Sequence, residues 1–160
     1  MSQRRVVVTG LGQISPVGNN VADAWQNLLA GVSGIGRITR FDAGELSAQI
    51  AGEVKDFQIG DYISAKEARR MDTFIHYGVA AALQAVADAG LDDYPALDKT
   101  RVGVNIGSGI GGLPSIEETG IVVHENGPRR INPFFIPGSL INLIAGHVTI
   151  LKGYQGPSYG

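Results

Sequence analysis

Residues 101–112 read RVGVNIGSGIGG and contain the pattern that decides the fold class. The first half alternates apolar residues with small or polar ones, which is typical of a β-strand. The second half is a loop with four glycines. We expect a helix from Pro114 to about His124, because proline suits the first turn of a helix. The order strand, glycine loop, helix indicates an α/β protein.

Helical periodicity predicts three further helices around this stretch. Asn20 is a typical N-cap, and apolar residues follow it at helical spacing until Gly31. Residues 74–89 are rich in alanine and poor in charge, which predicts a helix that is buried nearly all round and packed against a sheet. Residues 139–151 predict a last helix that ends at Gly153.

Two further segments predict strands. Residues 4–9 are a short β-branched run before Gly10, which is typical of a central strand covered on both faces, as in parallel sheets. Between residues 33 and 63 the pattern weakens, and only a short strand around Ile50 is expected. With no internal repeat or linker, residues 1–160 are predicted to form one α/β domain with a layered sheet.

The composition is that of a folded protein with balanced charge. The chain has 160 residues, of which 44% are hydrophobic and 18% are charged, so wholesale disorder is excluded. Thirteen Lys and Arg against 15 Asp and Glu give a formal net charge of -2, which argues against a nucleic-acid partner. With no cysteine, the chain has no disulfide, thiolate metal site or cysteine nucleophile.

The apolar runs are too short for a secretory leader or a membrane span. The run after Arg5 is only three valines long, and no cleavage site follows it. The longest apolar stretch, residues 140–151, falls short of the roughly 20 residues that a membrane span requires. We therefore expect a soluble, cytoplasmic protein without membrane insertion.

The glycine loop also fits G-x-G-x-x-G through Gly107, Gly109 and Gly112. A strand before it and a helix after it leave a dinucleotide-binding interpretation open. However, the second strand with an acidic end, which that fingerprint needs about 20 residues later, is missing. The favoured alternative is that the glycines allow tight turning and close approach of the backbone to a helix or an elongated ligand.

Residues 156–160 read GPSYG and fit the nucleophile-elbow pattern of serine hydrolases. The elbow requires a helix directly after the serine, and no such helix follows Ser158 in this sequence. Pro157 also interrupts the preceding strand. We expect an ordinary turn or the start of a strand here.

The three histidines do not predict a metal site. His76, His124 and His147 lie in different predicted helices, and none has a second ligand type at metal-binding spacing. We expect His76 and His147 to be hydrogen-bonded core residues and His124 to face solvent near a helix end.

Two basic clusters stand out, Lys66 with Arg69 and Arg70, and Arg129 with Arg130. The first three share a helix face by their spacing, and the last two follow a Gly-Pro turn. Each cluster is either solvated surface charge or a docking site for an acidic or phosphorylated partner. The pair Phe134-Phe135 lies between two prolines and is either core or the wall of an apolar substrate channel.

Five separated motifs carry a family resemblance: residues 4–19, 64–72, 106–113, 127–137 and 151–157. Taken together and in this order, they resemble the type II β-ketoacyl-[acyl-carrier-protein] synthases, the condensing enzymes of bacterial fatty-acid elongation. The resemblance covers the whole chain. It implies a thiolase-like fold with layers ordered α, β, α, β, α, of which this chain is the N-terminal part.

The resemblance also implies a reaction. Family members act as homodimers without a cofactor, on substrates carried by the phosphopantetheine arm of acyl carrier protein. An acyl chain moves to an active-site cysteine, malonyl carrier protein loses carbon dioxide, and the carbanion attacks the acyl thioester to give 3-oxoacyl carrier protein. In the family the cysteine follows the Gly-Pro-Ser segment and two histidines lie far downstream. No catalytic residue is therefore assigned here, and the chain alone is expected to be inactive.

The same resemblance implies roles in binding for several residues of this chain. Gly109 and Ile110 in the glycine loop are expected to border the acyl pocket, and Phe135 to reach toward the pocket of the partner subunit. The basic positions expected to face the acidic carrier protein are Lys66, Arg69, Arg70, Arg129 and Arg130.

Two alternatives to the condensing enzyme stay open at this point. One is a non-catalytic fragment that still binds carrier protein through its arginines, and the other is a nucleotide-binding α/β domain built on the glycine loop. In the condensing enzyme, the second half and the partner subunit would cover the apolar helices at residues 74–89 and 139–151. Without them, the chain alone is expected to expose apolar surface and to aggregate.

Overall fold

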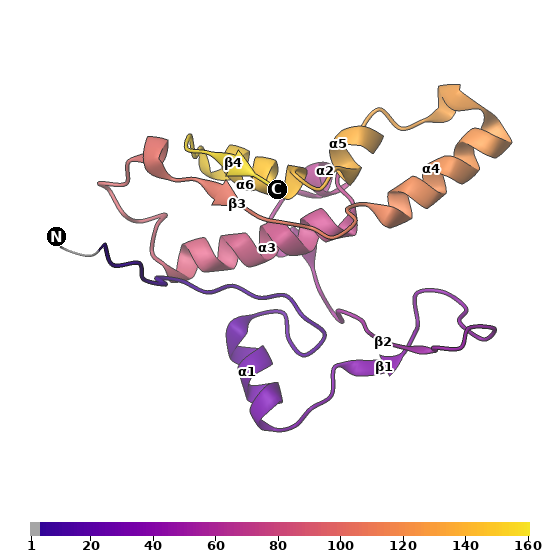
Figure 1. Ribbon diagram of the computed structural model, residues 1–160, viewed down its shortest axis with the longest axis horizontal. Helices are drawn as coiled ribbons and strands as arrows, with labels where there is room; N and C mark the ends of the chain where they lie inside the picture. Colours follow the sequence, from indigo (N-terminus) through magenta and orange to yellow (C-terminus); the bar gives the residue numbers. More distant parts are fainter. Residues whose placement is uncertain (1–3) are drawn as a thin grey trace.

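A computed structural model describes residues 4–160 (Figure 1). The helices are α1 (Val21–Leu29), α2 (Ala65–Ala68), α3 (Thr73–Asp88), α4 (Leu113–Asn126), α5 (Phe135–Ser139) and α6 (Leu143–Lys152). The strands are β1 (Ile35–Arg37), β2 (Ile50–Gly52), β3 (Val104–Asn105) and β4 (Ser158–Tyr159). Three 3-10 turns, η1 (Ile59–Asp61), η2 (Lys99–Arg101) and η3 (Pro128–Arg130), join them.

Helix α3 forms the centre of the core, as Figure 1 shows. Every residue from Thr73 to Val86 is buried or half-buried, whereas Ala87 and Asp88 are exposed, so the predicted burial holds for most of the helix. Its main partner was predicted wrongly, because α3 packs on helix α6 rather than on a broad sheet. The buried side chains of α3, including Ile75 and Val79, form one cluster with Ile144 and Val148 of α6. An apolar helix is covered equally well by another apolar helix.

The chain does not open with the predicted strand at residues 4–9. No strand within residues 4–160 pairs with it, and Val6 to Val8 are exposed. The chain instead runs extended along α3, where the Leu11 and Gln13 N–H groups donate to the side chains of Asp88 and Gln84. A β-branched run forms a strand only when a neighbouring strand supplies hydrogen-bond partners.

Within residues 4–160, the strands form two small sheets. β1 and β2 pair antiparallel, with Ile35 opposite Gly52, which confirms the strand expected around Ile50. β3 and β4 pair parallel, with Val104 opposite Ser158, so the GPSYG segment begins a strand as expected. The strand predicted over residues 101–106 is limited to Val104–Asn105, because its ladder with β4 is only two residues long.

The ends of the other helices follow from local chemistry. Asn20 caps α1 by accepting a hydrogen bond from the Asp23 N–H at 2.8 Å, as predicted. The last helix begins at Leu143 rather than at residue 139, because Leu140 is extended (φ -74°, ψ 137°) and breaks the helical run. Residues 135–139, predicted partly as loop, form the separate helix α5. Gly153 ends α6 in the left-handed conformation.

Many large apolar side chains remain exposed, among them Val6, Trp25, Ile110, Ile136 and Ile150. This exposure agrees with the expectation that the chain needs cover, and self-association of the chain alone stays a prediction. None of the helices described in residues 4–160 has the length and apolar character needed to cross a membrane.

A substitution at Gly12 tests the packing of the extended segment on α3. A methyl group there would overlap the Ala81 carbonyl oxygen and lie 2.7 Å from the Ala85 nitrogen. We expect Gly12→Ala to lower the free energy of unfolding by about 1–3 kcal/mol, measured by urea denaturation. Gly36→Ala is the matched control, since nothing lies within 4 Å of the added methyl group. Equal stabilities of the two variants would contradict this packing.

Candidate functional site

A cavity of about 360 Å³ lies where the turn between α2 and α3 meets α4, α5 and η3. Five of the residues singled out in the sequence line it: Arg69, Arg70, Arg130, Phe134 and Phe135. They come from segments about 60 residues apart, so the fold brings two members of the first basic cluster and one of the second to the same place as the aromatic pair. The cavity is therefore the candidate site.

Arg70 and Phe134 interact directly in this cavity. The guanidinium carbon of Arg70 lies 4.6 Å from the centre of the Phe134 ring. This geometry is a cation–π contact, in which the positive charge is attracted to the ring face. The predicted aromatic wall and the predicted basic cluster are thus parts of one site.

Asp72 fixes the floor of the cavity. Its side chain is buried, and its carboxylate accepts hydrogen bonds from the backbone N–H of Ser115, at 3.0 Å, and from the Ser115 hydroxyl. Its own N–H donates to the Gly138 carbonyl oxygen at 3.1 Å. Asp72 precedes α3 but does not cap that helix with its side chain. The carboxylate instead satisfies an N–H of the first turn of α4, where a negative charge is favourable.

The glycine loop packs beside the cavity without lining it. The Gly112 N–H donates to the Ser139 carbonyl oxygen at 3.0 Å, and a side chain at Gly112 would lie 2.8 Å from the Ser139 Cα. This close approach supports the packing interpretation of the glycine motif. A methyl group added at Gly109 would meet nothing within 4 Å, and Ile110 is 67% exposed. Their proposed contact with an acyl chain stays a prediction.

The predicted basic residues are all exposed, including Lys66 and Arg129, which lie outside the cavity lining. Within residues 4–160, the salt bridge found is Lys152 with Asp92, at 2.7 Å. None of the five basic side chains is therefore neutralised by an ion pair in the part of the chain that is described. Glu118 is an acidic side chain on the cavity rim.

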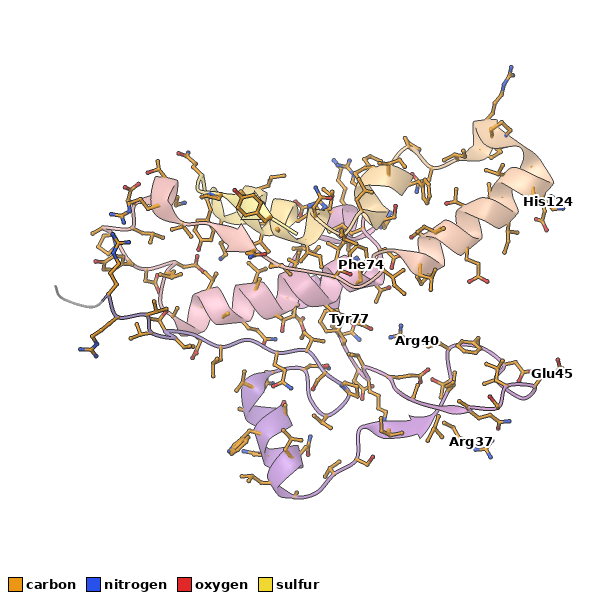
Figure 2. All side chains as sticks on the ribbon, in the orientation of Figure 1. Arg37, Arg40, Glu45, Phe74, Tyr77 and His124 are labelled. Carbon is orange, nitrogen blue, oxygen red and sulfur yellow. The ribbon has the colours of Figure 1, made fainter. Side chains whose placement is uncertain are left out.

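The histidines lie away from this cavity. His76 is hydrogen-bonded as predicted, with its Nε2 donating to the Ala68 carbonyl oxygen at 2.9 Å. His124 is exposed near the end of α4, also as predicted (Figure 2). His147 is only half-buried, and the prediction of a hydrogen bond is wrong for its Nε2, which is buried without a partner. Desolvation lowers the pKa of His147, partly opposed by the charge of Glu67.

The described residues give less support to a metal site or to a second binding site. Across residues 4–160, no three His, Asp or Glu side chains gather in an arrangement that holds a metal ion. A second cavity of about 330 Å³ lies beside the start of α1, with polar walls that include Asn19, Asp23, Lys55 and Asp56. It contains none of the residues predicted from the sequence.

Sequence reasoning missed Asp72 and Ser115 as parts of the site. An acidic residue directly before a helix is a recognisable signal, because Asp is a common N-cap. That signal would have assigned Asp72 to α3, whereas its carboxylate binds α4, 43 positions further along the chain. The contact could not be found from local pattern.

Residues 3–160 match the family described as "Beta-ketoacyl synthase, N-terminal domain". This chain belongs to the β-ketoacyl synthase family. The 3-oxoacyl-[acyl-carrier-protein] synthase 2 of Vibrio harveyi is 51% identical to it over 158 residues. Those residues are 99% of this chain and 38% of the relative, so the chain spans about two fifths of the curated relatives it matches.

Solved ketosynthases share the fold of this β-ketoacyl synthase domain. The ishigamide ketosynthase/chain length factor superposes with a TM-score of 0.85 at 30% identity, covering 98% of this chain and 39% of that one. A ketosynthase in complex with its type II PKS acyl-carrier protein gives a TM-score of 0.77 at 27% identity, covering 96% of this chain and 40% of that one. The predicted α/β, thiolase-like fold class is confirmed for this N-terminal part.

Removal of the Asp72 carboxylate tests the floor of the cavity. Asp72→Ala leaves the Ser115 N–H and hydroxyl without their acceptor. We expect it to lower the free energy of unfolding by about 3 kcal/mol, because hydrogen bonds to a charged group are each worth about 1.5–3 kcal/mol. Asp72→Asn keeps an acceptor oxygen, and Ser115→Ala removes only the hydroxyl bond. Both variants are therefore expected to lower the free energy of unfolding by less than Asp72→Ala does. Urea denaturation of the three variants checks this order, and a loss in Ser115→Ala equal to that in Asp72→Ala would contradict it.

Proposed function

We propose that this chain is the N-terminal part of a 3-oxoacyl-[acyl-carrier-protein] synthase of type II, which acts in fatty-acid elongation. The observation that carries the proposal is the identity of 51% over 158 residues with a curated synthase of that name. Nearly the whole chain takes part in the match, so the similarity is not confined to one common motif.

In the proposed reaction, an acyl group is first transferred from acyl carrier protein to a cysteine of the intact enzyme. Malonyl carrier protein then loses carbon dioxide, and its α-carbon forms a bond to the acyl carbonyl carbon. The cysteine thiolate leaves, and 3-oxoacyl carrier protein is released. The cysteine and the assisting histidines lie outside this chain, whose own residues would bind and orient the carrier and the acyl chain.

The basic residues around the cavity would dock the carrier protein. Arg69, Arg70 and Arg130 converge there without an ion-pair partner in residues 4–160, and Lys66 and Arg129 extend the positive surface. A carrier protein of acidic character would supply the missing carboxylates, and arginine binds carboxylate and phosphate groups in bidentate geometry. The similar ketosynthase solved with its acyl-carrier protein supports this assignment.

Gly109 and Ile110 would border the acyl pocket, and Phe135 would reach toward the pocket of the partner subunit. Ile110 is a large apolar side chain that is 67% exposed, and Phe135 lies on the cavity wall. Apolar groups of this kind are stabilised when an acyl chain or a second subunit covers them. By the family resemblance, we also propose that the intact protein is a homodimer that works in the cytoplasm, with no cofactor beyond the carrier's phosphopantetheine arm.

A condensation assay tests the proposed reaction. The full-length protein is incubated with an acyl carrier protein thioester and malonyl carrier protein, and the products are analysed by mass spectrometry. We expect 3-oxoacyl carrier protein, two carbons longer than the acyl substrate, with release of carbon dioxide. Reactions without the acyl donor, and with acyl coenzyme A in its place, are the controls. Product formed only from acyl coenzyme A would assign the protein to chain initiation, and no product from either donor would contradict the proposed function.

Charge reversal tests the docking surface. We expect Arg130→Glu to weaken the binding of acyl carrier protein about tenfold, because a repulsive contact replaces an attractive one. Arg37→Glu is the matched control, since Arg37 lies on the β1–β2 hairpin (Figure 2) and does not line the cavity. Isothermal titration calorimetry at two salt concentrations measures both affinities. Equal affinities of the two variants would exclude this surface as the docking site.

A further inference from the structure

Arg70 is the cavity arginine that stands over an aromatic ring. Its guanidinium carbon is 4.6 Å from the centre of the Phe134 ring, and both residues line the cavity together with Arg69 and Arg130. Within residues 4–160, the Arg70 side chain makes no hydrogen bond to another side chain or carbonyl group and no ion pair. The contact with the Phe134 ring is thus the interaction that positions the Arg70 guanidinium.

The backbone holds both partners of this contact in place. The Phe134 N–H donates to the Asn132 side chain at 2.9 Å, and its carbonyl oxygen accepts from the Gly138 N–H at 2.8 Å. The Arg70 carbonyl oxygen lies 2.8 Å from the position of a methyl group added to Gly138, so the two chain segments touch at this glycine. The Phe134 backbone is therefore held close to the Arg70 backbone.

A cation–π contact leaves the hydrogen-bonding capacity of a guanidinium unused. The ring attracts the positive charge but offers no lone-pair acceptor, so the five N–H donors of Arg70 remain available to an anion. A side chain that is already held loses less conformational entropy when a ligand binds it. Phe134 would therefore prepare Arg70 for an anionic partner.

We propose that Phe134 is a positioning residue for carrier-protein docking, which holds the Arg70 guanidinium ready for a carboxylate or phosphate of the acidic carrier. This inference rests on the proposed function. It gives a role in docking to an apolar residue, which a prediction based on charged residues alone would not include. Arg69 lines the same cavity and has no aromatic partner within residues 4–160, so its contribution is expected to be independent of Phe134.

The test is a double-mutant cycle on the full-length protein, with the dissociation constant of acyl carrier protein as the readout. Phe134→Leu keeps an apolar side chain and removes the ring. We expect it to weaken binding about two- to fivefold, which corresponds to the usual strength of an exposed cation–π contact. Phe134→Tyr retains the ring face and is expected to bind like the wild type. In enzyme assays, the effect of Phe134→Leu is expected in the KM for carrier-borne substrate more than in kcat.

The variants Arg70→Ala and Arg69→Ala provide matched backgrounds in which the effect of Phe134→Leu is measured again. In Arg70→Ala, adding Phe134→Leu is expected to cause no further loss of affinity, because the ring has no cation left to hold. In Arg69→Ala, adding Phe134→Leu is expected to weaken the binding of acyl carrier protein by the full two- to fivefold. Thermal melting of every variant identifies one that fails to fold, and Phe134→Met with Arg70→Gln then gives the second cycle.

The outcomes separate this inference from the proposed function. If the wild type does not bind carrier protein, the proposed docking function fails. If the wild type binds and Arg70→Ala weakens binding, but Phe134→Leu has no effect or acts equally in both arginine backgrounds, the positioning role is overturned. Tighter binding by Phe134→Leu would also overturn it, since the ring would then compete with the carrier for Arg70.

Discussion

The arrangement of this domain depends on one buried carboxylate. Asp72 receives two hydrogen bonds from Ser115 in the first turn of α4, and its backbone N–H binds the Gly138 carbonyl oxygen of α5. Its own carbonyl oxygen accepts from the Ile75 N–H in α3. A buried carboxylate is costly unless donors such as the two Ser115 groups are present, and the backbone bonds of Asp72 join α5 and α3 to the same point.

The cavity is a consequence of that placement. With α3, α4 and α5 joined at Asp72, the turn that carries Arg69 and Arg70 faces the segment that carries Arg130 and Phe134. Positive charge from two distant parts of the chain is thereby concentrated at an opening lined by aromatic rings. In the proposed function, such a surface would attract the acidic carrier protein over a distance and orient it on contact. The charge itself is modest, because the whole chain has a formal net charge of -2, so its placement matters more than its amount.

Prediction from the sequence succeeded where structure is governed by neighbours along the chain. The Asn20 cap, the alanine-rich helix and the turns at Gly31 and Gly153 follow from local hydrogen bonding and backbone conformation. Prediction failed at residues 4–9, since a strand requires a partner strand, which local sequence does not specify. It also failed for the surroundings of α3, because an apolar face indicates burial without indicating what covers it.

The sequence by itself determined the family, the positions of most helices and the residues that carry charge and aromatic rings. Those properties depend on residue types and on their spacing along the chain, and five separated motifs established the resemblance. Only the tertiary structure decided that Arg70 stands over Phe134, that Asp72 serves α4 instead of α3, and that Gly112 is needed for contact with Ser139. Each of these contacts joins residues at least 27 positions apart, and their geometry depends on how the helices pack rather than on any local pattern.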